Sequence, residues 1–279
     1  LSRICKKIKW NKFYYLIGPA KNIFNKKHTI KYTNLKEKIS SVDALICTTS
    51  FNDRSYYDSI QFAKKKGIYS ILVLDHWTFY KERLIKNKND FLPDEVVVFD
   101  KYASRILKKF FPLIKVRILE NPYLKEMIKG IKEQSKKTIK NSFNILYCTD
   151  STQVMKTSLN KKTKRIYGYS EFEALEYFFE NINNLMRKID LITIRIHPSE
   201  KTDKYDKIIK KYSSKFKIKK NRKVDLIKQI SISDTIVGCE TFPMVIGLYA
   251  NKNVVCSIPP KGKKSPLPFK KIKYLRDFV

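Results

Sequence analysis

Glycine is scarce in this sequence, with seven in 279 residues, so the glycine-rich loops that cradle phosphates in many dinucleotide-binding proteins are largely missing. The five cysteines are nowhere spaced as Cys-x-x-Cys, which excludes the common zinc and redox motifs. Most of them lie in apolar segments, as buried thiols do in a reducing compartment, so we expect a cytoplasmic protein. No apolar run approaches the roughly 18 residues of a membrane-spanning helix.

Acidic residues are also few, with 26 against 59 basic ones and a formal net charge of +33. Only ten of the basic residues are arginine, and lysine is spread along the whole chain. The charge predicts attraction to anionic surfaces, so we expect peripheral contact with the inner face of an anionic membrane. The charge also suits a protein of another functional class, a basic nucleic-acid-binding protein, which we keep as an alternative. No recognisable nucleic-acid motif is present, so we expect no such partner.

Strand-like and helix-like segments alternate along the chain, which predicts an α/β fold of parallel βαβ units. The length suits two domains. We predict a Rossmann-like domain over residues 1–130 and a second one over 143–279, with the polar, lysine-rich segment 129–142 as the linker. Because the chain begins with Leu1 and not with methionine, we expect a fragment in which the first domain lacks its start.

The most informative segment is 191–200, LITIRIHPSE. Isoleucines alternate with polar residues up to Pro198, which predicts a half-buried strand that ends there. Arg195 and His197 are then expected at the carboxyl edge of a parallel sheet, where ligands bind in open α/β folds. These side chains suit a phosphate. Alternatively, His197 satisfies a buried backbone group and Arg195 pairs with a surface carboxylate.

Two further strand ends carry polar groups. Strand 143–148 runs into a hydroxyl-rich loop in which Thr149 and Ser151 are candidate phosphate ligands. Strand 235–237 runs through a glycine to Glu240 and Thr241, which open a helix and so form an anion site. Glu240 suits a ribose or a base better than a phosphate. Its alternative role is that of a helix N-cap.

Arg-x-His-Pro at a strand end, followed about 40 residues later by strand, Gly-x-Glu-Thr and helix, resembles the nucleotide-binding half of glycosyltransferases with the GT-B fold. The sequence is most similar to bacterial sialyltransferase-like and capsule or lipopolysaccharide transferases that use CMP-activated acidic sugars. The segments 74–80, 92–102 and 120–123 also look like N-terminal halves of this class. The resemblance covers residues 70–260 and implies two Rossmann-like domains facing a central cleft. The Asp/Glu-Asp/Glu-Gly motif of that family is absent.

The resemblance implies transfer of a sugar from a nucleotide donor to a surface glycan or lipid-linked glycan. His197 would contact the donor phosphate and Thr241 the phosphate or ribose. CMP-linked donors carry one phosphate and often need no metal, so we expect no metal and no cofactor. An epimerase acting on nucleotide sugars and a CDP-glycerol-type glycerophosphotransferase are alternatives on the same fold.

Direct displacement also needs a base for the acceptor hydroxyl. Asp53, Asp75 and His76 are the candidates, because each follows a predicted strand of the first domain. The Asp75–His76 pair is the first choice. The alternative for Asp75 is a structural role, capping the next helix.

Overall fold

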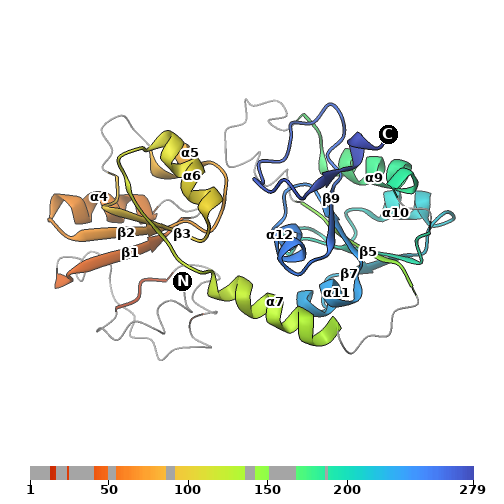
Figure 1. Ribbon diagram of the computed structural model, residues 1–279, viewed down its shortest axis with the longest axis horizontal. Coiled ribbons are helices and arrows are strands. Elements are labelled where there is room, and N and C mark those ends of the chain that lie inside the picture. The colour runs from red at the N-terminus through yellow and green to blue at the C-terminus, as the bar shows by residue number, and fades with distance from the viewer. Residues whose placement is uncertain are drawn as a thin grey trace. The chain divides into compact units, whose positions relative to one another are not determined.

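The computed structural model describes residues 13–16, 24, 41–49, 55–85, 92–135, 142–150, 168–185 and 188–279. Two candidate site residues, Asp53 and Ser151, lie outside these ranges. The chain divides into two compact units, Leu1–Tyr123 and Leu124–Val279. Figure 1 shows a parallel sheet with its own helices in each unit, and each is described by itself.

Unit 1 contains a four-stranded parallel sheet in which sequence neighbours are also spatial neighbours. Its strands are β1 (Ala44–Thr48), β2 (Tyr69–Val73), β3 (Glu95–Val98) and β4 (Lys115–Ile118). The connecting helices are α4 (Ser55–Lys65), α5 (Tyr80–Leu84) and α6 (Lys101–Phe110). Gly67 ends α4 with a φ of +70°, as the sequence predicts for a C-terminal glycine.

Unit 2 contains a six-stranded sheet in the order β10-β9-β8-β5-β6-β7, parallel throughout. Its strands are β5 (Asn144–Cys148), β6 (Leu191–Arg195), β7 (Ile218–Asn221), β8 (Thr235–Gly238), β9 (Asn253–Cys256) and β10 (Lys273–Tyr274). The helices are α7 (Pro122–Ser135), α9 (Glu171–Leu185), α10 (Asp206–Tyr212), α11 (Leu226–Ile232), α12 (Phe242–Tyr249) and the 3-10 helix η2 (Leu275–Asp277). This is the strand order of a Rossmann fold, with the direction of winding reversed between β5 and β8.

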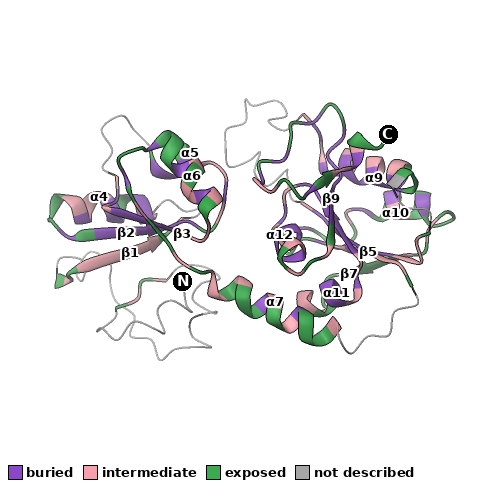
Figure 2. Ribbon diagram, in the orientation of Figure 1, coloured by how far each residue is buried: buried purple, intermediate pink, exposed green. Residues whose placement is uncertain are grey.

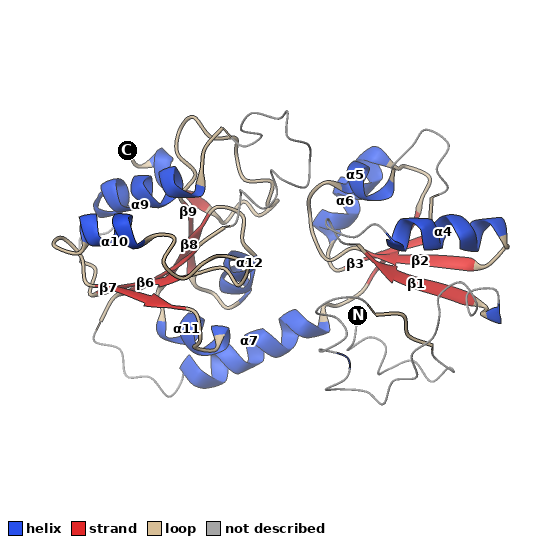
Figure 3. Cartoon of the chain, turned by 180° about the vertical axis from the view of Figure 1, so that it is seen from behind, coloured by secondary structure: helices blue, strands red, loops and turns tan. Residues whose placement is uncertain are grey.

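Helices cover both faces of the unit 2 sheet (Figure 3). On one face Val237 and Val255 belong to the same buried cluster as Phe178 of α9. On the other face a Cβ on Gly247 of α12 would lie 2.8 Å from Ile236. Since neighbouring residues of a strand point to opposite faces, every residue of β8 is buried. Figure 2 shows mostly buried residues in the central strands of this sheet.

Helix α7 replaces part of the predicted linker. Residues 129–135 form its second half, and the division between the units falls at residues 123 and 124. The reason is a periodic apolar face: Met127 and Ile131 are buried, and a Cβ on Gly130 would lie 3.1 Å from Ile227 of α11. Because most other residues of its second half are polar or charged, the average composition resembles that of a linker, although the buried residues recur with the period of a packed helix.

Candidate functional site

The reversal of strand order in unit 2 brings together the polar groups that follow β5, β6 and β8. Thr149 and Asp150 follow β5, His197 follows β6, and Glu240 and Thr241 follow β8. Strands β6 and β8 flank β5, so their ends lie about 10 Å apart at the usual strand spacing. The sequence-predicted residues of unit 2 therefore meet at the topological switch point, where open α/β sheets bind ligands.

The loop after β6 is held by a buried carboxylate that sequence reasoning missed. The backbone N–H of His197 donates to Thr149 Oγ1 at 2.8 Å, and that hydroxyl donates to Glu200 at 2.6 Å. Glu200 is 6% exposed and also accepts from Lys204 and Tyr205. Burial alone would raise the pKa of Glu200, but these hydrogen bonds lower it below its ordinary value. The hydroxyl hydrogen of Thr149 is used inside the protein, so this side chain positions His197.

His197 is an exposed residue, and its Nδ1 contacts Ser199 twice, once through the Oγ atom at 2.6 Å and once through the backbone N–H. The backbone N–H of Ser199 donates to Nδ1 at 3.2 Å. When Nδ1 accepts this N–H bond, the neutral ring carries its proton on Nε2. Burial lowers the pKa of His197, although Glu200 raises it, and the neutral ring is favoured. His197 therefore presents an Nε2–H donor, the group that a phosphate oxygen requires.

Arg195 is bound within the protein. Its Nη1 donates to the carbonyl of Val224 at 2.8 Å and to Gln229 Oε1. These partners belong to the connection from β7 to α11 and to α11 itself, and neither is the surface carboxylate of the alternative hypothesis. The predicted phosphate contact of Arg195 therefore competes with two internal hydrogen bonds.

The start of α12 carries an unpartnered hydroxyl. Thr241 is the N-cap and makes no side-chain capping bond. It is 9% exposed, and among the described residues its buried Oγ1 has no hydrogen-bond partner. A Cβ on Gly238 would lie 3.1 Å from this oxygen and from the Cys148 carbonyl, so glycine is needed there. A buried hydroxyl without a partner is unfavourable unless a ligand supplies one, and the helix dipole at this end favours an anion.

Glu240 forms an acidic pair with Asp150. The backbone N–H of Glu240 donates to Asp150 Oδ2 at 3.2 Å. The buried Oε1 of Glu240 has no partner among the described residues, and the N-cap role falls to Thr241. Burial, and then the charge of Asp150, raise the pKa of Glu240 to about 8. A carboxyl group that is neutral at pH 7 can donate a hydrogen bond. Asp150 was missed because the sequence shows it only as one member of a hydroxyl-rich loop.

Two of the three candidate bases of unit 1, Asp75 and His76, follow β2. Asp75 is exposed and His76 is half-buried. Burial lowers the pKa of His76, Asp75 raises it and Arg83 lowers it. The N-cap of α5 is Phe79, with a φ of 58°, so Asp75 does not have the capping role. Positive φ at a bulky residue is strained and is commonest near functional sites.

Asp100, at the end of β3, is structural: its Oδ1 accepts from the backbone N–H of Ala103 at 2.7 Å and its Oδ2 from Trp77 Nε1 at 2.7 Å.

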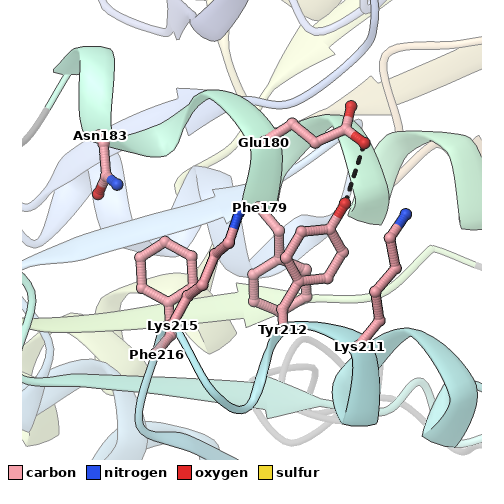
Figure 4. Close-up of a pocket in the computed structure, with 7 residues that line it drawn as sticks. All are labelled: Phe179, Glu180, Asn183, Lys211, Tyr212, Lys215 and Phe216. Carbon is pink, nitrogen blue, oxygen red and sulfur yellow. Dashed lines mark hydrogen bonds between the residues drawn. The ribbon is translucent and has the colours of Figure 1, made fainter.

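A surface pocket of about 330 Å³ lies away from the switch point (Figure 4). Its lining comes from α9, α10 and the segment before β7: Phe179, Glu180, Asn183, Lys211, Tyr212, Lys215 and Phe216. Phe179 stacks on Tyr212 with ring centroids 4.7 Å apart, and Tyr212 donates to Glu180 at 2.9 Å. Because the pocket lies where β7 begins, it belongs to the opposite edge of the sheet, and its groups already bind one another.

No family model and no curated protein matches the sequence, whereas solved structures do. The S. aureus protein MnaA, solved with UDP, is 13% identical and superposes with a TM-score of 0.50 over 82% of this chain and 66% of MnaA. UDP-GlcNAc 2-epimerase from Methanocaldococcus jannaschii is 14% identical with a TM-score of 0.48, over 80% of this chain and 64% of that one. MurG from Acinetobacter baumannii is 11% identical with a TM-score of 0.48, over 88% and 64%.

The likeness is one of fold. Two Rossmann-like units in one chain are the GT-B class, so the predicted fold class is confirmed. The chain spans less than two thirds of the length of these three proteins. In the part of the chain that the structure describes, no helix could cross a membrane, and no three His, Cys, Asp or Glu side chains are grouped as metal ligands.

Proposed function

We propose that the protein is a GT-B glycosyltransferase that moves a sugar from a nucleotide donor to a glycan or lipid-linked glycan. The observation that carries the proposal is the pair of anion-binding groups at the switch point. These are the buried hydroxyl of Thr241 at the start of α12, which has no hydrogen-bond partner among the described residues, and the imidazole of His197. Both residues follow strands that flank β5, and in this fold class nucleotide phosphates bind beyond the carboxyl ends of such strands.

On the donor side the chemistry is stabilisation of a leaving phosphate. When the glycosidic bond to phosphate breaks, negative charge develops on the phosphate oxygens. His197, Thr241 and the dipole of α12 are arranged before the reaction and stabilise that charge. Glu240, protonated beside Asp150, binds a neutral part of the nucleotide, the ribose or the base. Pro198 holds the turn on which His197 lies, and Ser151, outside the described residues, remains a candidate phosphate ligand from the sequence.

On the acceptor side we propose direct displacement with a base from unit 1. His76, with a pKa below its ordinary value, is neutral at pH 7 and can take the proton of an acceptor hydroxyl. Asp75 beside it stabilises the imidazolium that forms. Asp53, which lies outside the described residues, is the third candidate from the sequence.

The donor is proposed to be a CMP-activated acidic sugar, because the Arg-x-His-Pro and Gly-x-Glu-Thr segments resemble enzymes that use such donors. One phosphate matches a site with two anion-binding groups. No metal, cofactor or nucleic acid is required by this chemistry. The acceptor is proposed to belong to capsule or lipopolysaccharide, made on the cytoplasmic side of the membrane.

Calorimetric titration with CMP, UDP, CDP and a short oligonucleotide, on the wild type and His197→Ala, tests the proposal. CMP is expected to bind the variant about tenfold or more weakly, because one charge-assisted hydrogen bond is lost. Lys210→Ala, which removes an exposed charge on α10, serves as the control and should bind CMP normally. The proposal would be contradicted if only the oligonucleotide bound, with an affinity that depends strongly on salt and is the same for the wild type and His197→Ala.

Uridine diphosphate is the second ligand to consider, because MnaA was solved with UDP and has the same fold. Tighter binding of UDP than of CMP would be consistent with the proposed nucleotide site but would favour an epimerase as the enzyme. Tighter binding of CDP would favour the glycerophosphotransferase. Incubation of each nucleotide sugar without acceptor separates the reactions, since only an epimerase converts the donor by itself.

A further inference from the structure

The turn between α6 and β4 exposes two large apolar side chains. Leu113 is 98% exposed and Phe110 is 52% exposed. Their neighbours Phe111 and Ile114 are 8% and 7% exposed, so the turn alternates between residues buried in unit 1 and residues that project from it. An isolated exposed apolar side chain is common, but two at the tip of one turn are a feature to explain.

This turn is held in a defined shape. Lys108 of α6 donates from Nζ to the carbonyl of Pro112 at 2.9 Å and to that of Ile114 at 2.6 Å. The backbone N–H of Phe111 continues the helix to Leu107 at 2.9 Å. The buried Phe111 and Ile114 anchor both sides of the turn. Leu113 is therefore presented outward by a rigid support.

The surroundings of the turn are strongly basic. Residues 101–119 contain six lysines and arginines and no acidic residue. Two of the six, Lys115 and Arg117, share the buried carboxylate of Glu95, which leaves one of their charges unbalanced. Lys109, next to Phe110, is exposed. Basic residues thus flank the apolar tip on both sides in the chain, and apolar side chains beside cations are the combination that binds anionic lipid headgroups and inserts below them.

The size of the apolar tip distinguishes a bilayer from a protein partner. Fully burying a phenylalanine covers about 150–250 Å², and a leucine less. A specific protein interface needs about 800 Å² on each partner. Two projecting side chains fall short of that area, whereas a bilayer accepts them without a matching surface.

We propose that the α6–β4 turn is a membrane-docking element, with Phe110 and Leu113 inserting into an anionic bilayer and Lys109 contacting its headgroups. The turn precedes β4 and so lies at the amino edge of the unit 1 sheet. Asp75 and His76 follow β2 at the carboxyl edge of the same sheet. Docking through the turn therefore leaves the candidate catalytic edge accessible.

Co-sedimentation of the full chain with vesicles tests this, using phosphatidylcholine with and without phosphatidylglycerol. The wild type is expected to bind the anionic vesicles and to be released by salt. The double variant Phe110→Ser, Leu113→Ser is expected to bind them about tenfold or more weakly, because its apolar insertion is lost. Phe278→Ser, at another exposed aromatic residue (44%), is the matched control and should bind as the wild type does.

A second pair separates the local charge from the net charge of the chain. Lys109→Glu should weaken vesicle binding more than Lys210→Glu, which makes the same charge change on α10 of unit 2. Equal effects of these two variants, an unaffected double variant, or no binding to anionic vesicles would each overturn the proposal. So would a change of oligomeric state in the double variant without loss of vesicle binding, because the turn would then contact protein. Since the readout is vesicle binding, the result is independent of nucleotide binding at unit 2.

Discussion

At the scale of the residue, the feature with the clearest consequence is the carboxyl group of Glu240. Burial and the neighbouring Asp150 raise its pKa to about 8 from an ordinary value of 4.5. In the unfolded chain the group ionises at its ordinary value, so between the two pKa values the native state binds more protons than the unfolded state. The contribution of Glu240 to stability is fully present below the lower value and is lost as pH rises through the higher one.

Glu240→Gln should therefore make stability less dependent on pH. The wild type is expected to lose free energy of unfolding, relative to the variant, as pH rises from about 5 to about 8.5. Denaturant unfolding of both proteins across this range measures the difference. Glu133→Gln, at a side chain with 62% exposure on α7, is the control and should run parallel to the wild type. A constant difference between Glu240→Gln and the wild type at every pH would show that Glu240 does not titrate in this range.

At the scale of the element, α9 shows how a local sequence signal can determine a helix start. The Ser170 backbone N–H donates to Glu173 Oε2 at 2.7 Å, and the Glu173 N–H donates to Ser170 Oγ at 3.2 Å. This reciprocal pair is the capping box that the sequence predicts. Helix α9 then packs Leu175, Phe179 and Ile182 into the core of unit 2. The cap and the apolar face both stabilise α9, so loss of the cap is expected to weaken the packing of this helix in the core.

Ser170→Ala is expected to lower the free energy of unfolding of unit 2 by about 1 kcal/mol, the usual effect of removing an N-cap. Thermal unfolding followed by circular dichroism measures it. Ser214→Ala, at an exposed position after α10, should have no effect. Equal stabilities for all three proteins would mean that the hydrogen bonds of Ser170 are replaced by water without loss.

At the scale of the whole molecule, the chain consists of two units, each with its own parallel sheet. The candidate nucleotide site at the switch point lies within the second unit. A ligand stabilises the part of a protein that binds it, by about 2.7 kcal/mol at a hundredfold excess over its Kd. Ligand-linked stability therefore reports which unit holds the site.

Differential scanning calorimetry of the full chain is expected to show two transitions, one for each unit. Nucleotide should raise the Tm of one transition and leave the other unchanged. His197→Ala should abolish the increase, while His76→Ala in unit 1 should retain it. If the increase in Tm is retained in His197→Ala but absent in His76→Ala, the nucleotide binds to unit 1, and the proposed site is contradicted.

The order and type of most elements follow from the amino-acid sequence, because these depend on local period and capping. The alternation in 191–197 and its end at Pro198 predict β6, and the capping box predicts α9. Gly-x-Glu-Thr predicts the start of α12. The second half of α7 was not predicted from the average composition of 129–142, because only one residue in three or four of this helix lies on its buried face.

Only the tertiary structure decided what the site side chains bind. The order of the strands placed β5 between β6 and β8, which made Asp150 the neighbour of Glu240 and Thr149 the neighbour of His197. These pairs are 90 and 48 residues apart in the chain, so no local pattern contains them. Burial, which raises the pKa of Glu240 and lowers that of His197, is likewise a property of packing. The sequence supplied the chemical groups at each strand end, and the arrangement of strands determined which of them lie together.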